Sequence, residues 1–354
     1  MLQHILITPF SYRRIEYQPD KMPNPLKSGI LKKRFRFFEM ITLPSIKAQE
    51  NSDFTWIIVV DPLLPAAYRN KFSVITTGMK NVFLHNFTPE VAANNTGWLK
   101  PYIHPETGYL IISELDADDG IFRGFTRYVQ DYYSNLIESG QIQPIQFLSC
   151  KNVLQWDFFN TPKAPLGFIK PWTRANTPTV AAGLTACCKY PEMDFSIFGV
   201  GHRLVSLLFE DNPTGDLDST LIYRVEELRN TIKKIAARSD LAFNAEVSSE
   251  NNFHQIATNE PQTLVTNNLL NMRFIRFFEE PGKRIVFDSQ TSVPGIEIDY
   301  DLAARLIKAN RKILPLLAVL LWKFLFEKNY VNISSKKSKL TMIKRLIRGF
   351  RNMK

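Results

Sequence analysis

Three carboxylates crowd together directly after an apolar run of the sequence. The run from residue 109 to 115 is typical of a buried strand. It ends in three aspartates, Asp116, Asp118 and Asp119. Crowded carboxylates repel one another unless a cation or a phosphate-bound metal neutralises them, and ligands of open α/β sheets bind at the carboxyl ends of the strands. The pattern therefore predicts a divalent-metal site here, with Gly120 opening a turn into a helix from Ile121 to Leu136.

Other classes of acidic site fit this spacing less well. A calcium EF-hand loop needs glycine at its sixth position, whereas counting from Asp116 puts Gly120 at the fifth. A haloacid-dehalogenase-like phosphatase also places Asp-x-Asp after an apolar strand, but Gly120 stands where we expect Thr or Val. That phosphatase stays the alternative enzyme. A helix dipole favours acidic residues at a helix N-terminus, which explains one or two aspartates but not three after a strand.

Two further polar positions follow predicted strands. Asp61 comes directly after the apolar run 54–60, where a carboxylate can accept hydrogen bonds from a ribose or a base. Arg13 and Arg14 follow the short strand predicted at 4–8, and two guanidinium groups there could meet a diphosphate. The alternatives are an ordinary turn aspartate and two solvated arginines.

The elements that position these residues alternate between strand and helix. Apolar runs predict strands at 4–8, 54–60, 81–87 and 109–115, and helical patterns fall at 29–49 and 66–75. Pro44 lacks a backbone donor, so we expect the first helix to kink or restart there. The alternation predicts an α/β fold with a doubly wound, mostly parallel sheet and flanking helices. Further strands are predicted within 145–148, 153–159, 166–169, 177–188 and 284–287, helices at 204–209 and 219–238, and a polar loop or lid at 244–262.

Length and composition indicate a globular protein with reduced cysteines. The 354 residues are 45% hydrophobic, which is ample for a core in one large domain or two ordinary ones. The three cysteines are odd in number, and none has metal-site spacing. We expect Cys150, Cys187 and Cys188 to be buried, in a cytoplasmic protein. The N-terminus lacks a basic segment followed by a long apolar core, so we expect a first strand there and no signal peptide.

The positive charge of the chain is concentrated at its C-terminal end. The formal net charge is +10, but residues 336–354 contribute eight basic and no acidic residues. The remaining residues carry 36 basic against 34 acidic side chains. A polynucleotide-binding domain would spread basic residues over a face and interleave aromatics. We therefore expect no nucleic-acid partner.

Two segments resemble one family of glycosyltransferases. The segment Arg36–Asp61 and the later Leu115–Gly120, with the sequence Leu-Asp-Ala-Asp-Asp-Gly, are similar in order and separation to the rhamnosyltransferase family of GT-A-type enzymes. They resemble more distantly the family-two glycosyltransferases, whose first repeat runs through a Ser, a Gln and a Phe to an apolar strand ending in Asp. The similarity covers roughly residues 1–150. One departure is Glu114, where we expect an arginine.

The resemblance implies roles for the acidic residues. Asp61 would contact the nucleoside, Asp118 the ribose or diphosphate, and Asp119 together with Asp118 the metal, Mn²⁺ or Mg²⁺. Asp116 would support the turn or the metal ligands, and Arg13 is the candidate contact for the diphosphate. A GT-A-like catalytic domain would occupy residues 1–300, with the nucleotide-sugar half at about 1–150 and the acceptor half at about 151–300.

The resemblance also implies the substrates and the setting. The donor would be a nucleotide-diphosphate sugar, with rhamnose suggested by the family name alone, and the acceptor would be a glycan or a lipid-linked molecule in surface polysaccharide synthesis. The setting would be the cytoplasmic face of a bacterial membrane. No residue selects the sugar, the nucleotide or the stereochemical outcome. A catalytically inactive, membrane-associated scaffold of the same fold is the rival hypothesis.

A transferase of the inverting type needs a carboxylate base for the acceptor hydroxyl. In related enzymes this base follows the metal motif, and the candidates here, with Asp211 first, are Asp211, Glu210, Glu192 and Asp194. A solvated helix end explains these residues equally well. A later histidine completes the metal site in some such folds. His202 and His254 are the options, and a structural role is the stronger expectation for each.

The segment 301–354 predicts a helical, basic tail. Residues 313–326 form an apolar run of 14 residues with Lys323 inside, and a bilayer-spanning helix needs about 20. Apolar residues from Leu340 to Phe350 then fall on one side of a helix, with Lys344, Arg345, Arg348 and Arg351 on the other. This pattern predicts a helix lying on an anionic membrane surface. A docking helix with a solvated basic side is the alternative.

Overall fold

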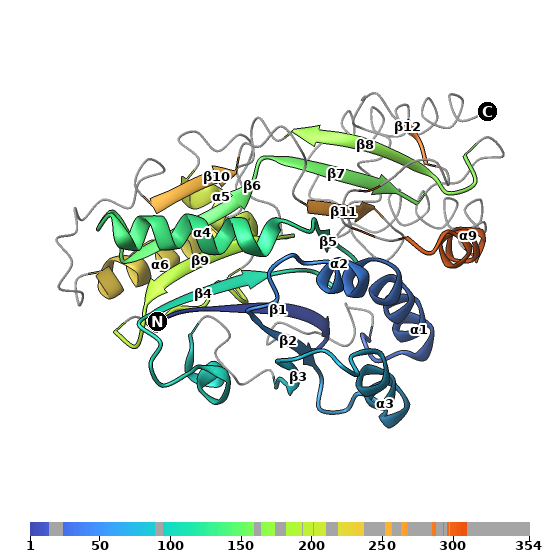
Figure 1. Cartoon of the computed structure of the whole chain (residues 1–354), viewed down its shortest axis with the longest axis horizontal. Coiled ribbons are helices and arrows are strands. Elements are labelled where there is room, and N and C mark those ends of the chain that lie inside the picture. The colour runs from blue at the N-terminus through green and yellow to red at the C-terminus, as the bar shows by residue number, and fades with distance from the viewer. Residues whose placement is uncertain are drawn as a thin grey trace. The chain divides into compact units, whose positions relative to one another are not determined.

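A computed structural model shows the chain as two compact units (Figure 1). It describes residues 1–13, 24–88, 95–158, 164–173, 182–192, 194–200, 202–209, 219–236, 252–256, 263–267, 285–287, 293, 296 and 298–309. The first unit comprises residues 1–153, 172–264 and 294–297, and the second comprises 154–171, 265–293 and 298–354. The domain boundaries expected near residues 150 and 300 stay predictions.

A seven-stranded sheet forms the centre of the first unit. Its order is β10-β6-β9-β4-β1-β2-β3. The strands are β1 (Leu2–Ser11), β2 (Thr55–Val60), β3 (Val82–Asn86), β4 (Tyr109–Glu114), β6 (Ile145–Cys150), β9 (Leu184–Lys189) and β10 (Phe253–Ile256). Every neighbouring pair is parallel except the two that β9 makes with β4 and β6. The prediction of an α/β fold with a mostly parallel sheet is confirmed.

Helices cover both faces of this sheet. The α-helices of the first unit are α1 (Ser28–Phe37), α2 (Leu43–Lys47), α3 (Ala66–Ile75), α4 (Phe125–Glu138), α5 (His202–Phe209) and α6 (Ser219–Ala236). On one face, Phe38 stacks on Trp56 of β2 at 5.6 Å between ring centroids, and Tyr133 of α4 donates to the Gln146 carbonyl. Apolar residues on both faces of a strand are the mark of a parallel sheet covered on both sides.

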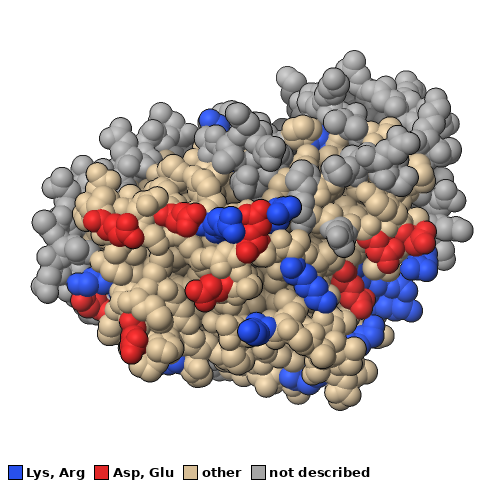
Figure 2. Space-filling model, in the orientation of Figure 1, with Lys and Arg blue, Asp and Glu red and all other residues tan. Residues whose placement is uncertain are grey.

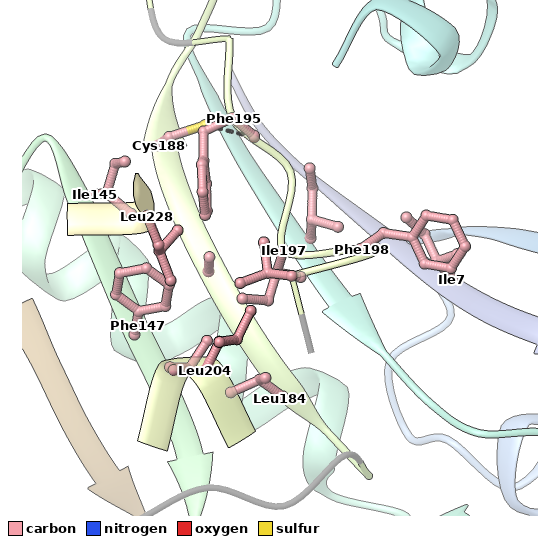
Figure 3. Packing of buried hydrophobic residues seen from close by; sticks show 14 of the residues in the cluster. Ile7, Ile145, Phe147, Leu184, Cys188, Phe195, Ile197, Phe198, Leu204 and Leu228 are labelled. Atoms are coloured by element: carbon pink, nitrogen blue, oxygen red, sulfur yellow. Dashed lines mark hydrogen bonds between the residues drawn. The ribbon is translucent and has the colours of Figure 1, made fainter. Parts of the chain in front are cut away.

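The opposite face of the sheet packs against α5, α6 and the segment 194–200. Figure 3 shows Phe195, Ile197 and Phe198 of this segment beside sheet residues such as Ile7 and Leu184. Helices α5 and α6 add Leu204 and Leu228 to the same buried cluster. The Cys188 thiol points to the Phe195 carbonyl at 3.7 Å.

The cysteines are buried, as the sequence predicted. Cys150, Cys187 and Cys188 lie on strands β6 and β9 as free thiols. Burial raises the pKa of the Cys150 and Cys188 thiols to about 12, so they stay protonated at neutral pH.

The first helix restarts at the predicted position. A π-helical turn, η1 (Phe38–Thr42), separates α1 from α2, and the Leu43 amide donates to the Phe38 carbonyl. Pro44 has no amide hydrogen, and its ring would clash with the carbonyl four residues earlier in a continuous α-helix. The wider turn relieves that clash, and the chain winds on as a helix through Lys47.

Two predicted elements differ in the structure. The helix expected from Ile121 begins at Phe125, because Gly120–Ile121 forms a short strand, β5, paired antiparallel with Thr263 and Leu264 of β11 (Thr263–Asn267). The loop expected at 244–262 contains β10, which pairs with β6 at the edge of the sheet. In both cases the deciding hydrogen bonds come from strands remote in sequence.

The described part of the second unit is small. Strand β7 (Asn152–Asp157) continues into it from the first unit, and most of β8 (Phe168–Thr173) belongs to it. Within it, β12 (Ile285–Val286) pairs antiparallel with β8 and Trp156 donates to the Leu166 carbonyl at 2.8 Å. Helix α9 (Tyr300–Ala309) is the last element described. The apolar run 313–326 and the basic helix predicted after it lie outside the described residues.

The described surface carries charges of both signs. On the face shown in Figure 2, Lys and Arg residues are interspersed with Asp and Glu. A broad basic face, such as a polynucleotide-binding domain would present, is not seen on the described residues of this side. No helix within the described ranges is long and apolar enough to cross a membrane.

Candidate functional site

The strand order reverses at β1. From β1 the chain builds outward through β2 to β3, and then returns to place β4 on the other side of β1. This reversal is a topological switch point, and ligands of open α/β sheets bind there, outside the carboxyl ends of the strands. The carboxyl ends of β1, β2 and β4 lead to Arg13, Asp61 and Asp116 respectively. The residues that the sequence singled out thus follow three adjacent strands of the sheet.

Asp116 to Asp119 form a tight turn, called here the acidic turn. The Asp119 amide donates to the Asp116 carbonyl at 3.1 Å, which closes a four-residue β-turn. Asp119 is buried, while Asp116 and Asp118 are partly exposed. The Leu115 amide donates to the Ile7 carbonyl at 3.0 Å, so the turn starts directly from the paired part of the sheet.

Arg13 and Asp61 form an ion pair across the ends of β1 and β2. The Arg13 Nε donates to Asp61 Oδ2 at 2.7 Å, and Nη2 donates to Oδ1 at 3.2 Å. The Leu63 amide also donates to Oδ1, at 2.8 Å. The Asp61 side chain is fully buried, whereas the Arg13 side chain is 34% exposed. A group approaching from solvent therefore meets the guanidinium before the carboxylate.

The acidic turn offers a donor set that fits a hard divalent cation. Among the described residues, no three His, Cys, Asp or Glu side chains lie close enough together to form a complete metal site. Asp118 and Asp119 are adjacent carboxylates, and Mg²⁺ typically takes one or two carboxylates with substrate phosphates and water as its other ligands. Mn²⁺ shares this preference for carboxylate oxygen. The two aspartates thus fit a cation that arrives with a diphosphate.

Two of the four carboxylates considered as the catalytic base lie among the described residues. Glu210 and Asp211, the first choices for the base, lie outside the described residues. Asp194 accepts hydrogen bonds from the Thr96 amide at 2.6 Å and hydroxyl at 2.8 Å. Glu192 pairs with Lys189 at 2.7 Å. The latter two carboxylates thus have structural partners.

The two candidate histidines lie in regular elements. His202 is the first residue of α5. His254 on β10 stacks on Tyr132 at 4.4 Å between ring centroids, and its Nε2 lies 3.4 Å from the Tyr128 hydroxyl. Burial lowers the pKa of His254, so it stays neutral at physiological pH. Strands β6 and β9 stand between β10 and β4 in the sheet, so His254 is not brought to the acidic turn.

The sequence did not single out two buried residues that contact the backbone around the acidic turn. Thr42 donates to the Asp119 carbonyl, and Gln49 donates to the Phe122 carbonyl. Both lie in the segment Arg36–Asp61, whose Ser, Gln and Phe were noted only as part of a resemblance. Gln49 stands in the polar stretch 47–53, so its burial could not be predicted from the sequence, although a glutamine that is buried is nearly always hydrogen-bonded.

The comparison with protein families supports the resemblance over part of the chain. Residues 20–148 match the family described as "Putative rhamnosyl transferase". This span contains Asp61 and the whole acidic turn. No curated protein matches the sequence.

Solved structures give weaker likenesses. S. aureus TarS 1-349 aligns with a TM-score of 0.32 and 10% identity, over 78% of this chain and 62% of that one. Its complex with UDP aligns with a TM-score of 0.33 and 11% identity, over 99% and 72% of the two chains. Mouse xyloside xylosyltransferase 1 aligns with a TM-score of 0.25 and 10% identity, over 43% and 53%. At these scores the likenesses do not establish a shared fold.

Proposed function

We propose that this chain is a metal-dependent glycosyltransferase, because residues 20–148 match a glycosyltransferase family. It moves a sugar, rhamnose in the family description, from a nucleotide-diphosphate donor to a glycan or lipid-linked acceptor. The observation that carries the proposal is the placement of Arg13, Asp61 and the acidic turn at the carboxyl ends of three adjacent strands beside the switch point.

The donor half of the reaction uses these residues in distinct roles. Asp118 and Asp119 would hold Mn²⁺ or Mg²⁺, and the metal would supply positive charge for the diphosphate leaving group. Asp116 begins the acidic turn and supports its shape. Arg13 offers its partly exposed guanidinium to the diphosphate, and Asp61 orients it through the two hydrogen bonds. A contact of Asp61 itself with the nucleoside stays a prediction.

The acceptor half requires a base. Transfer with inversion needs a carboxylate within hydrogen-bond reach of the acceptor hydroxyl, to take its proton as the new glycosidic bond forms. We propose Asp211, with Glu210 as the second choice, on their order in the sequence alone.

The test is a donor panel assayed with and without Mn²⁺. UDP, dTDP and GDP sugars, including rhamnose donors, are incubated with the protein, and release of the nucleoside diphosphate is measured. Asp118→Asn and Asp119→Asn should each reduce turnover about 100-fold or more if they hold the metal. Asp131→Asn, an exposed aspartate on α4, is the matched control and should keep wild-type turnover.

The outcomes separate the competing hypotheses. Loss of donor turnover in the two variants and after chelation, with an active control, supports the transferase. Release of inorganic phosphate from phosphomonoesters, with no donor turned over, would instead indicate the phosphatase. An inactive scaffold would turn over no donor, and Asp119→Asn would leave its nucleotide binding unchanged.

We further propose that the chain works at the cytoplasmic face of a membrane, through its basic C-terminal tail. Each Lys or Arg near an anionic surface adds about 1 kcal/mol of attraction. Liposome flotation tests this with phosphatidylserine-containing and neutral vesicles. Changing Lys344, Arg345, Arg348 and Arg351 to Gln should abolish recovery on the anionic vesicles. Equal recovery of the wild-type and changed chains would contradict the membrane proposal.

A further inference from the structure

A buried hydroxyl contacts the backbone of the acidic turn. Thr42 Oγ1 donates to the Asp119 carbonyl at 2.8 Å and lies 3.4 Å from the Asp116 carbonyl. Thr42 is fully buried. The two carbonyls belong to the first and last residues of the turn, so this single hydroxyl contacts both of its ends.

A buried amide holds the chain that follows the turn. Gln49 Nε2 donates to the Phe122 carbonyl at 2.9 Å and to the Ser45 carbonyl at 2.8 Å. Its Oε1 accepts from the Thr126 amide at 3.1 Å, in the first turn of α4. Gln49 therefore ties the exit of the acidic turn and the start of α4 to the end of α2.

Thr42 and Gln49 flank the short helix α2 in the chain. Thr42 directly precedes Leu43, where α2 begins, and Gln49 follows Lys47, where it ends, by two positions. Thr42 ends the π-helical turn, and the Ser45 hydroxyl donates to its carbonyl at 2.8 Å. The helical winding around Pro44 thus sets where the two polar side chains meet the acidic turn.

The hydrogen bonds of Thr42 and Gln49 oppose the opening of the acidic turn. Asp118 and Asp119 are neighbouring carboxylates, and their like charges repel each other when no cation is present, which favours opening the turn. A carbonyl that loses a buried donor carries the cost of desolvation, so the hydrogen bonds of Thr42 and Gln49 oppose that opening. Residues that orient metal ligands from behind typically change metal affinity when they are replaced.

We propose that Thr42 and Gln49, called here the clamp, are positioning residues that hold Asp118 and Asp119 in place for the metal-bound diphosphate of the donor. The inference rests on the proposed function. Neither residue touches the reacting atoms, and both act through the backbone of the acidic turn.

Two measurements on the full-length chain test the clamp. The first is amide hydrogen exchange across residues 116–122. The second is the dissociation constant of Mn²⁺ in the presence of UDP or dTDP, followed by the electron paramagnetic resonance signal of free Mn²⁺. Thr42→Val removes the hydroxyl at nearly constant volume and Thr42→Ser retains it, while Gln49→Met is the second variant should Thr42→Val fail to fold.

Thr185→Val is the matched control. Thr185 is fully buried on β9, and its hydroxyl bonds Ser113 at 2.7 Å and the Gly183 carbonyl at 3.0 Å, neither of which belongs to the acidic turn. This substitution removes a buried hydroxyl and lowers stability without touching the clamp.

If Thr42 and Gln49 act as the clamp, the amides of the acidic turn should exchange faster in Thr42→Val and Gln49→Met, and these variants should bind Mn²⁺ about tenfold more weakly. Thr42→Ser should stay close to wild type. The proposal is wrong if Thr42→Val and Gln49→Met show the same amide exchange in the acidic turn and the same Mn²⁺ affinity as Thr185→Val. Failure of the proposed function is distinguishable, because the wild-type chain would then bind no Mn²⁺ with either nucleotide. Exchange in the acidic turn would still report whether the clamp holds it.

Discussion

The ion pair between Arg13 and Asp61 offers the sharpest test of the site. We consider Arg13→Met, which keeps most of the aliphatic volume and removes the charge and the donors. Two charge-assisted hydrogen bonds of 2.7 and 3.2 Å are lost, and the Asp61 carboxylate, fully buried in the wild type, loses its cationic partner. Hydrogen bonds to charged groups contribute about 1.5–3 kcal/mol each.

The exposure of Arg13 lowers this value. Its side chain is 34% exposed, so solvent screens part of the attraction, and water can enter when the side chain is shortened. We therefore expect Arg13→Met to cost about 2–3 kcal/mol, below the roughly 3–5 kcal/mol of a completely buried pair. Asp61→Asn, which leaves no buried charge behind, should cost about 1–2 kcal/mol. The double variant should cost less than the sum, by about 1–2 kcal/mol.

The assay is native-state hydrogen exchange of the β1 and β2 amides. It is preferred to a single denaturation curve because a chain with two compact units need not unfold in one step. Arg123→Met is the matched control. Arg123 pairs with Glu50 at 2.8 Å, but its side chain is 65% exposed, so we expect a change below about 0.5 kcal/mol.

The same cycle tests the functional role of the pair. If Asp61 acts by orienting Arg13, then each single variant and the double variant should weaken nucleoside diphosphate binding by similar factors. Additive losses of binding would point to an independent contact of Asp61 with the nucleotide. If Arg13→Met costs no more than Arg123→Met and the coupling energy between Arg13 and Asp61 is zero, the ion pair stabilises neither the fold nor the site.

Three further predictions follow from buried groups. Burial lowers the pKa of His4 from 6.5 to about 3, so between those pH values the unfolded chain takes up a proton on His4 and the folded chain does not. The free energy of unfolding should therefore fall by about 1.4 kcal/mol per pH unit below pH 6.5 because of this residue. Subtracting the pH profile of stability of His4→Gln from that of the wild type isolates the effect. A Cβ on Gly120 would lie 2.7 Å from Ile296 Cδ1, so Gly120→Ala should cost about 1–2 kcal/mol, measured by native-state hydrogen exchange. A Cβ on Gly124 meets nothing within 4 Å, so Gly124→Ala should change stability by less than about 0.5 kcal/mol. A thiol reagent at pH 8 should label the native chain slowly and the urea-unfolded chain fully, and rapid native labelling would contradict the burial of Cys150, Cys187 and Cys188.

Much of the first unit follows from local pattern. The helix expected at residues 66–75 has those bounds as α3, and the strands expected at 54–60 and 81–87 are β2 and β3 within one residue at each end. These elements depend on the spacing of apolar residues along a few turns or a short strand. The restart near Pro44 was predictable for the same reason, since a missing amide hydrogen is a property of the residue itself.

The order and direction of the strands in the sheet could be predicted less well from the sequence. Strand β9 enters between β4 and β6 and runs antiparallel to both, although the chain reaches it only after β8. An apolar run shows that a strand is buried, but it does not identify the neighbours of that strand. The same limit explains β10, whose four residues pair with β6 from about a hundred positions away.

For the candidate site, local sequence patterns were enough to predict which side chains stand at the carboxyl ends of strands: Asp61 after β2, Arg13 after β1 and the three aspartates after β4. The contacts of those side chains and of their backbone became known from the fold. Asp61 meets Arg13 across 48 positions, and Thr42 meets Asp119 across 77. The physical reason is the range of the interactions: strand and helix preferences act between near neighbours in the chain, whereas these hydrogen bonds form only after the sheet has brought distant segments together.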